Sequence, residues 1–153
     1  MLRFAVASLA LLMMTSVVSA HCQVPCGIYG DQRRFEEMLE DEQTISKAQL
    51  QLNELSGGDI DTQSVNQMVR WTTTKEDHAT NVQRVIADYF MAQRIKPDSE
   101  GYGKKLMAAH AVMVAAMKAK QSADPATAEV LEKAILDFYR AYEGKEPTFE
   151  HSH

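Results

Sequence analysis

Apolar residues recur at intervals of three and four along four separate stretches of this chain. That spacing places side chains on one face of an α-helix. The stretches cover about residues 31–55, 62–94, 100–121 and 124–144, and strand-type alternation of apolar and polar residues is scarce elsewhere. Because short connections join the stretches, the pattern predicts an all-α fold, an antiparallel up-and-down four-helix bundle.

Helix start and stop signals set the bounds of these stretches. Asp31 is the expected N-cap of the first, and the run Ser-Gly-Gly at 56–58 ends it. The turn at 96–99, which contains a proline, ends the second. Asp124 is the expected N-cap of the fourth, and Gly144 closes it. The bundle is therefore expected to span residues 31–144, with a flexible tail over 145–153.

The apolar stripes of the four stretches provide the expected core. We interpret their methionine and aromatic side chains as packing residues with no chemistry of their own. The stripe of the second stretch is interrupted by a polar middle at residues 73–77. The main inward-facing positions are expected to be Phe35, Met38, Leu39, Ile45, Leu52, Val65, Met68, Val69, Thr72, Val82, Ile86, Phe90, Leu106, Ala109, Val112, Met113, Ala116, Ala128, Leu131, Ile135, Phe138 and Tyr142.

The first 20 residues differ from the rest of the chain. One charge, Arg3, stands near the start, an apolar run follows, and small residues lead to Ala20. These features predict a secretory signal peptide that is cleaved after Ala20. The alternative is an uncleaved anchor, but its apolar part of about 17 residues is at the short limit for a membrane span. We therefore expect an exported protein, periplasmic or extracellular, with no membrane attachment after cleavage.

The net charge of the chain limits the classes of macromolecule that it is expected to bind. The chain has 16 Lys and Arg against 21 Asp and Glu, and loss of Arg3 with the signal leaves 15 against 21, a formal charge of −6. Nucleic-acid binding requires a concentrated basic surface, so this balance argues against a nucleic-acid partner. The 133 residues that follow Ala20 suffice for one domain with a sizeable core.

The only two cysteines, Cys22 and Cys26, come directly after the signal peptide, in the run HCQVPCGIYGD. Cleavage after Ala20 would make His21 the first residue and free its α-amine. An amine, an imidazole, two thiols and the Cys22 amide would then lie within residues 21–26. These nitrogen and sulfur donors suit a soft transition metal. The proline and glycines of residues 21–30 favour an irregular hook over a helix.

The donor types limit the choice of metal. Two thiolates favour zinc, copper(I) or nickel. A structural zinc site has four side-chain ligands, more than His21, Cys22 and Cys26 provide. The remaining donors would be the terminal amine and the Cys22 amide, and copper(II) and nickel(II) can enforce a deprotonated amide. Anionic thiolate and amide donors with an apical imidazole fit nickel that cycles between two oxidation states. The competing expectation is a disulfide between Cys22 and Cys26.

The run HCQVPCGIYGD resembles the nickel hook of the nickel superoxide dismutases, whose pattern is His-Cys-x-x-Pro-Cys-Gly-x-Tyr. The segment Ala-Asp-Tyr-Phe at 87–90 also resembles a family segment, although Met91 stands where the family commonly has lysine. All fixed positions of the hook pattern are matched, by His21, Cys22, Pro25, Cys26, Gly27 and Tyr29.

The resemblance implies an enzyme, its nickel cofactor and a role for each hook residue. The reaction would convert superoxide, the small-molecule substrate, to dioxygen and hydrogen peroxide by cycling between Ni(II) and Ni(III). His21 would supply its amine and imidazole, Cys22 its amide and thiolate, and Cys26 a second thiolate. Tyr29 would lie over the open face of the metal and limit access. The family also implies a homohexamer that encloses its hooks between subunits.

In the family a glutamate and an arginine hold the axial imidazole, which fixes the orientation of the ring. Glu36 is the closer match for the glutamate, with Glu37 as a second possibility, and Arg70 is the best match for the arginine.

Two other functions remain open on the residues alone. A secreted helical binding protein would use a Cys22–Cys26 disulfide only as a tether, but a disulfide requires neither His21 at the cleavage site nor Tyr29. A metal carrier would use the same hook without turnover. Tyr29 above an open face favours turnover, so we expect the enzyme.

Overall fold

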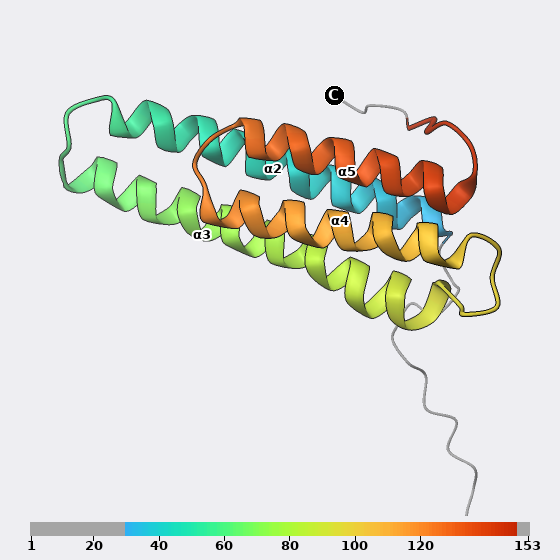
Figure 1. The fold of residues 1–153 in the computed structure, drawn as a ribbon. Coiled ribbons are helices and arrows are strands. Elements are labelled where there is room, and N and C mark those ends of the chain that lie inside the picture. Colours follow the sequence, from blue (N-terminus) through green and yellow to red (C-terminus); the bar gives the residue numbers. More distant parts are fainter. Residues whose placement is uncertain (1–29, 150–153) are drawn as a thin grey trace, which may run out of the picture.

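The computed structural model describes residues 30–149, in which four antiparallel helices form one bundle (Figure 1). The chain runs through α2 (Asp31–Ser56), α3 (Thr62–Arg84) with its π-helical continuation η1 (Val85–Arg94), α4 (Tyr102–Gln121) and α5 (Ala126–Glu143). α2 packs against α3 and α5, and α4 packs against the same two helices. The predicted all-α four-helix bundle is confirmed. Residues 30–149 contain no strand.

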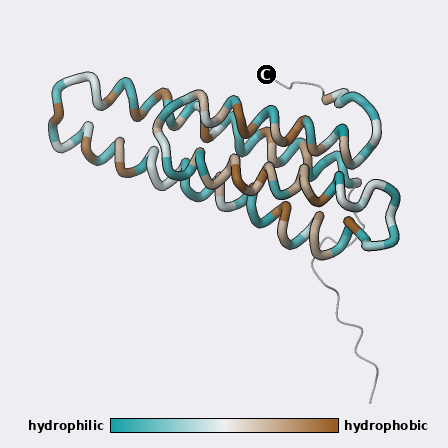
Figure 2. Tube along the Cα trace, in the orientation of Figure 1, coloured by the Kyte–Doolittle hydropathy of each residue, from teal (hydrophilic) through white to brown (hydrophobic). Residues whose placement is uncertain are grey.

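The core follows the apolar stripes of all four helices, and hydrophobic positions recur along each of them in Figure 2. Aromatic side chains gather at the end of the bundle where α2 begins. The ring of Phe35 lies 4.8 Å from that of Phe90 and 5.2 Å from that of Phe138, measured between centroids. Phe90 and Phe138 are 4.9 Å apart in an edge-to-face arrangement. Such pairs add to the stabilisation that burial alone provides.

The helix bounds lie within two residues of those predicted. The predicted cap at Asp31 is wrong, because Gly30 occupies the N-cap position and Asp31 is the first helical residue. Asp124 precedes α5 by two residues, and its Oδ1 accepts a hydrogen bond from the amide of Ala126 at 3.0 Å. Gly144 closes α5 in the left-handed conformation, with φ of 70°, as the sequence predicts.

The predicted tail begins close to α5 before it leaves the described residues. Glu146 accepts a hydrogen bond from Arg140 at 2.8 Å. The ring of Phe149 packs 4.9 Å from that of Tyr139. Residues 145–149 therefore lie against the last helix, and residues 150–153 are outside the described range.

The last ten residues of the second predicted helix form the π-helix η1. Its final turn is closed by the amide of Ile95, which donates to the carbonyl of Phe90 at 2.8 Å, a bond to the fifth preceding residue. The wider turn changes the direction in which Tyr89 and Phe90 point relative to a regular α-helix, and such turns are frequent at functional sites. The apolar periodicity of the sequence did not predict this change.

The hairpin of α2 and α3 extends past the ends of the other two helices (Figure 1). Lys75 donates to the carbonyls of Ala119 and Lys120, and Gln49 donates to the carbonyl of Ser122 at 3.2 Å. α4 therefore ends level with the middle of α3. Residues 62–74 of α3 precede that level and span about 20 Å at 1.5 Å per residue.

The predicted burial of the stripe at residues 65–72 is therefore wrong. Val65 is 45 % exposed and Val69 is 60 % exposed. The stripe has the right helical spacing, but α4 and α5 stop before they reach it. Among the helices of residues 30–149, none is both long and apolar enough to cross a membrane.

Candidate metal centre

The predicted metal donors His21, Cys22 and Cys26, and the predicted gate Tyr29, lie outside the described residues. The signal peptide lies outside them as well. The described range begins at Gly30, the residue after Tyr29, and α2 begins one residue later. The start of α2 is therefore the described part that is nearest in sequence to the predicted hook.

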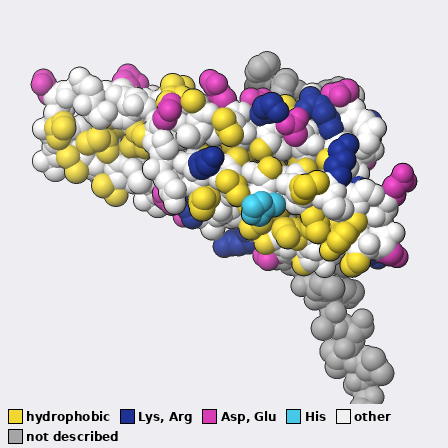
Figure 3. Space-filling model, in the orientation of Figure 1, with side chains coloured by type: hydrophobic (Ala, Val, Ile, Leu, Met, Phe, Trp, Pro, Cys, Tyr) yellow, Lys and Arg dark blue, Asp and Glu magenta, His cyan; other side chains and the backbone are white. Residues whose placement is uncertain are grey.

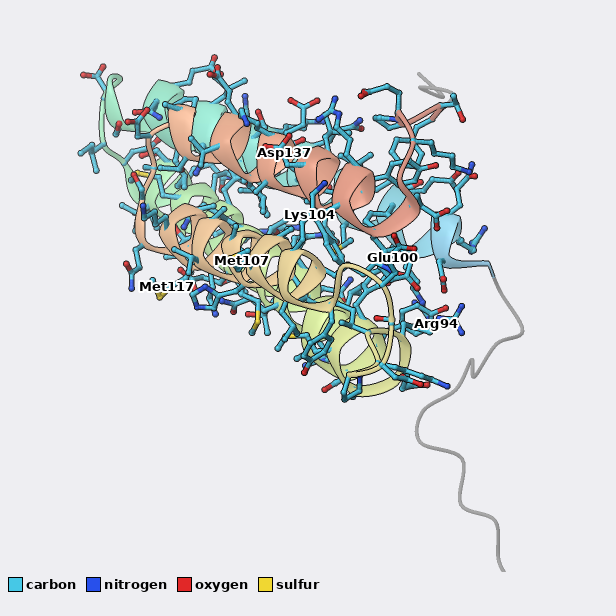
Figure 4. All side chains as sticks on the ribbon, turned by 45° about the vertical axis from the view of Figure 1, so that its right-hand side comes forward. Arg94, Glu100, Lys104, Met107, Met117 and Asp137 are labelled. Carbon is cyan, nitrogen blue, oxygen red and sulfur yellow. The ribbon has the colours of Figure 1, made fainter. Side chains whose placement is uncertain are left out.

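Four side chains from three helices meet at the start of α2. Asp31 Oδ1 accepts a hydrogen bond from the Tyr89 hydroxyl at 2.5 Å. Its Oδ2 accepts from Arg94 Nη2 at 2.7 Å and from the Tyr142 hydroxyl at 2.7 Å. We call these four residues the Asp31 cluster. It joins the first turn of α2 to η1 and to the end of α5, and Figure 4 places Arg94 at this end of the bundle.

The cluster fixes the protonation states of its members. Burial alone would raise the pKa of Asp31, but hydrogen bonds from Arg94, Tyr89 and Tyr142 outweigh it and hold that pKa below its usual value. Burial, together with the hydrogen bond to Asp31, raises the pKa of Tyr89 to about 12. The same causes raise the pKa of Tyr142. At neutral pH Asp31 is therefore an anion that accepts from two neutral tyrosines and a guanidinium.

Aromatic and cationic groups support the cluster from both sides. The guanidinium of Arg34 lies 5.2 Å from the centre of the Tyr89 ring, and that of Arg94 lies 5.9 Å from it. Beneath the cluster, the ring of Phe35 lies 6.0 Å from that of Tyr142. Phe35 is fully buried. The first turn of α2 is thus held by charge, hydrogen bonds and packing together.

The predicted glutamates lie in the second turn of α2. Glu36 Oε1 accepts a hydrogen bond from Gln32 at 2.9 Å. Glu37 Oε2 pairs with Arg34 at 2.6 Å, and Glu37 Oε1 accepts from Asn81 on α3 at 3.3 Å. Both carboxylates are half-buried. Glu36 therefore bonds to a residue one helical turn away, whereas Glu37 is also bonded to the neighbouring helix.

Within one chain the structure does not bring Arg70 to the predicted glutamates. Asn81 marks the part of α3 that faces Glu37. Arg70 precedes Asn81 by 11 positions, which is about 16 Å along an α-helix. Arg70 is exposed and lies on the overhanging part of α3. The pairing of Glu36 and Arg70 stays a prediction.

Sequence reasoning missed the Asp31 cluster. Asp31 stood at a helix start, where a capping role is the common expectation. Tyr89 was part of the family-like segment at 87–90, and that was the one available signal. Arg94 and Tyr142 are 63 and 111 positions from Asp31. Contacts over such separations depend on the packing of whole helices, and no local spacing indicates them.

The predicted hook carries donor types that fit nickel, and the described residues offer no competing cluster. Within residues 30–149, no group of three or more His, Cys, Asp or Glu side chains is arranged to hold a metal ion. Both cysteines of the chain stand at positions 22 and 26. Thiolate, imidazole and backbone nitrogen donors suit nickel, whereas the carboxylates of the described range suit harder ions.

Comparison with known proteins gives the family. A search of curated proteins found no match, and neither did a search of solved structures. Residues 16–146 match the family described as nickel-containing superoxide dismutase. The match covers the two cysteines, the four helices and the Asp31 cluster. The chain therefore belongs to the nickel-containing superoxide dismutases, the enzymes that use nickel to convert superoxide to dioxygen and hydrogen peroxide.

Proposed function

We propose that this nickel superoxide dismutase is exported, loses residues 1–20, and binds its nickel through His21, Cys22 and Cys26. The observation that carries the proposal is the run HCQVPCGIYGD, which matches the hook pattern at every fixed position and follows a signal-like segment. The family match includes this run. The compartment would be the periplasm or the exterior of the cell.

Each hook residue has a distinct task. Cys22 and Cys26 supply thiolates, and the Cys22 amide and the His21 amine supply nitrogen. The His21 imidazole would supply a further nitrogen donor. When bound, nickel supplies an electron to one superoxide and takes one from the next. Tyr29 would restrict access to the bound nickel, so that only small anions enter.

The Asp31 cluster supports this proposal from the described side. A hook needs a fixed base, because donors on a loose segment do not hold a metal in one geometry. Asp31 stands two positions after Tyr29 and is bonded to two other helices. The cluster therefore fixes the chain at the residue that follows the hook. Glu36 and Arg70 remain the proposed partners of the His21 imidazole.

We also propose a homohexamer. Residues 21–30 are short and rich in glycine and proline, and one bundle offers them a single supporting end. Neighbouring subunits would enclose the hook and complete its surroundings. In such an assembly Arg70 of one chain could serve the hook of another, since it lies far from the start of its own α2.

Substitution of a thiolate tests the site. Cys26→Ser should lose nickel and dismutase activity, because a hydroxyl is a poor replacement for a soft donor. Metal content by mass spectrometry and superoxide consumption are the two readouts. Met107→Ser is a matched control, since Met107 is 70 % exposed on α4 and points outward in Figure 4. Normal activity in the Cys26→Ser protein would refute the hook.

Substitution of the His21 imidazole separates nickel binding from turnover. His21→Gln keeps the amine, the amide and both thiolates, so nickel should stay bound while most turnover is lost. Loss of nickel from this variant would contradict the proposed division of roles and assign the imidazole to assembly of the site.

The mature N-terminus tests export and activation together. Active protein should begin with the sequence His-Cys when its N-terminus is read, because only cleavage after Ala20 frees the His21 amine. An active enzyme that still carries Ala20 would contradict both the cleavage site and the role of the amine.

A further inference from the structure

A line of polar side chains runs along the contact between α2 and the helix formed by α3 and η1. Asp31, Arg34, Glu37 and Asp41 follow one another on α2 at steps of three, three and four, so they share one face of that helix. Each of them contacts a side chain of α3 or η1. We call these residues, together with their partners His78, Asn81, Tyr89 and Arg94, the polar seam.

The seam continues the Asp31 cluster along α2. The guanidinium of Arg34 lies 5.2 Å from the centre of the Tyr89 ring, and its Nη1 pairs with Glu37 Oε2 at 2.6 Å. Glu37 Oε1 accepts a hydrogen bond from Asn81 Nδ2 at 3.3 Å. The contacts therefore form one continuous path from Asp31 to Asn81.

The far end of the seam is a carboxylate–histidine pair. Asp41 is 6 % exposed, and its Oδ2 accepts from the same Asn81 Nδ2 at 2.8 Å. Its Oδ1 lies 2.6 Å from His78 Nδ1. Because the carboxylate accepts at this position, Nδ1 carries the hydrogen and Nε2 is left as the free ring nitrogen. The His78 ring lines an open cavity with Thr80 and Arg84.

The pair does more for direction than for stability. Burial raises the pKa of Asp41, and the hydrogen bonds from His78 and Asn81 oppose that rise. Buried charged pairs often add no more stability than apolar side chains of the same size, because their desolvation is costly. What the bonds do provide is orientation. The amide of Asn81 gives one hydrogen to Asp41 and the other to Glu37, so its position is set from both sides.

The neighbouring glutamate shows what the seam adds. Glu36 is bonded to Gln32 on its own helix. Glu37 is bonded to Arg34 on its own helix and to Asn81 on α3. A side chain with bonds to two helices is held in one rotamer, and functional sites depend on surroundings that are fixed in this way. The seam therefore fixes side chains on the α2 face that leads to the hook.

We propose that Asp41 and His78 are positioning residues for the nickel centre. They act through the rest of the polar seam on the Asp31 cluster, which directly follows the hook in the sequence. Neither residue touches nickel or superoxide in this proposal. The proposal rests on the hook proposed above, and it adds a set of contacts that holds the base of that hook from about 15 Å along α2.

Two substitutions of His78 separate the Nδ1 donor from the rest of the ring. His78→Asn keeps an N–H donor near the position of Nδ1, whereas His78→Gln moves the donor away from Asp41. In the nickel-loaded His78→Gln protein, nickel content should stay native while the electron paramagnetic resonance spectrum of the oxidised metal shifts. Turnover should fall about tenfold, as for other side chains that orient metal ligands. His78→Asn should match the native protein in spectrum and turnover.

The same variants test the seam without nickel. In the apoprotein, His78→Gln should shift the nuclear magnetic resonance signals of the Asn81 side-chain amide and of the Tyr89 ring, because the path from His78 to Asp31 passes through both. His78→Asn should leave both signals in place. Nitrogen-15 shifts of the native His78 ring should show the hydrogen on Nδ1.

His110→Gln is the matched control. His110 is exposed on α4 and lines a groove between α4 and α5. Figure 3 shows a histidine among hydrophobic side chains on the face that these helices form. Because His110 is outside the polar seam, its substitution should leave the nickel spectrum, the turnover and the Tyr89 signals unchanged.

The outcomes separate this proposal from the proposed function. A native spectrum and native turnover in His78→Gln overturn the positioning role alone, as do unmoved Tyr89 signals in its apoprotein. Equal losses in His78→Asn and His78→Gln also overturn it, because the Nδ1 donor would then not be the group that matters. Native protein that binds no nickel overturns the proposed function, and the positioning role with it.

Discussion

The two ends of this bundle differ in how far their polar and apolar groups are paired or buried within one chain. At the end where α2 begins, Asp31 is bonded to three side chains and the aromatic rings beneath it are buried. At the other end, Ile60, Val65 and Val69 are exposed on a hairpin that outruns its partners. The first end satisfies its polar and apolar groups within one chain. The second leaves apolar groups that the described part of the chain does not cover. The comparison separates residues that stabilise the fold from exposed apolar residues that the fold does not use.

The largest effect is expected from Phe35→Ala at the hook end. Phe35 is fully buried and contacts the rings of Phe90, Phe138 and Tyr139. Its loss should lower the free energy of unfolding by about 3–5 kcal/mol, the usual range for a buried phenylalanine. Urea unfolding followed by circular dichroism measures this. A loss below about 1 kcal/mol, similar to that expected for an exposed residue, would show that the aromatic group does not hold this end.

Glu42 lies between the two ends and is a carboxylate without the partners that Asp31 has. It is 7 % exposed, and no hydrogen bond within residues 30–149 reaches it. Burial, with a smaller contribution from Glu132, raises its pKa from 4.5 to about 7. Below pH 4.5 both folded and unfolded chains are protonated at this group, so it costs nothing. Between pH 4.5 and 7 only the unfolded chain ionises, and stability falls.

Glu42→Gln should therefore stabilise the protein most above pH 7. A raised pKa of this size corresponds to at most about 3 kcal/mol at 1.36 kcal/mol per unit. Urea unfolding at pH 4, 6 and 8 should show a difference that grows with pH and is close to zero at pH 4. Glu132→Gln is the control, because Glu132 is exposed, and it should show a much smaller gain. A difference independent of pH would exclude ionisation of Glu42 as the cause.

Asp31→Asn should have an intermediate effect at the hook end. Its three hydrogen-bond donors would lose an anionic acceptor, which should lower the free energy of unfolding by about 1–3 kcal/mol. The pKa of Asp31 is held below its usual value, so its contribution is complete above about pH 5 and is lost as pH falls through the folded pKa. The difference between variant and native protein should therefore shrink in acid.

Asp98→Asn is the matched control for Asp31→Asn, because Asp98 is exposed in the turn before α4. It should leave the unfolding curve unchanged at neutral pH. Equal effects of the two substitutions would mean that the Asp31 cluster adds nothing beyond an ordinary surface carboxylate.

The smallest effect on folding is expected from Val69→Thr in residues 62–74 of α3, which extend past the other two helices. The side chain is 60 % exposed, so the free energy of unfolding should change by less than about 0.5 kcal/mol. The measurement is urea unfolding at nanomolar protein, followed through the single tryptophan, Trp71. A loss above 1 kcal/mol at this dilution would place Val69 in the folded core and remove the contrast between the two ends.

Local patterns predicted the parts of the fold that depend on neighbouring residues. Glycine at 144 predicted the end of α5, and apolar spacing predicted four helices to within two residues. Spacing cannot tell whether a partner helix reaches a stripe, and so the burial of Val65 and Val69 was predicted wrongly. The π-helical turn around Tyr89 was missed for a related reason, because the same apolar residues suit either helix type.

For the metal site, the donor residues could be predicted from the sequence, but their surroundings could not. The types and order of residues 21–29 were sufficient to predict nickel chemistry, since few donor sets combine two thiolates, an imidazole and a free amine. The Asp31 cluster, which we propose supports that site, was not predictable. Arg94 and Tyr142 meet Asp31 only because three helices converge.

The contact between Asp31 and Tyr142 also bears on the order in which contacts form as the chain folds. The two residues are 111 positions apart, and Tyr142 lies in the last turn of the final helix. Contacts of such long range form late, after the intervening loop has closed. The first helix of the bundle therefore completes its contacts only after the last helix has been made. A chain that stops before α5 keeps His21, Cys22 and Cys26, the predicted nickel donors, and lacks the tyrosine that bonds to Asp31.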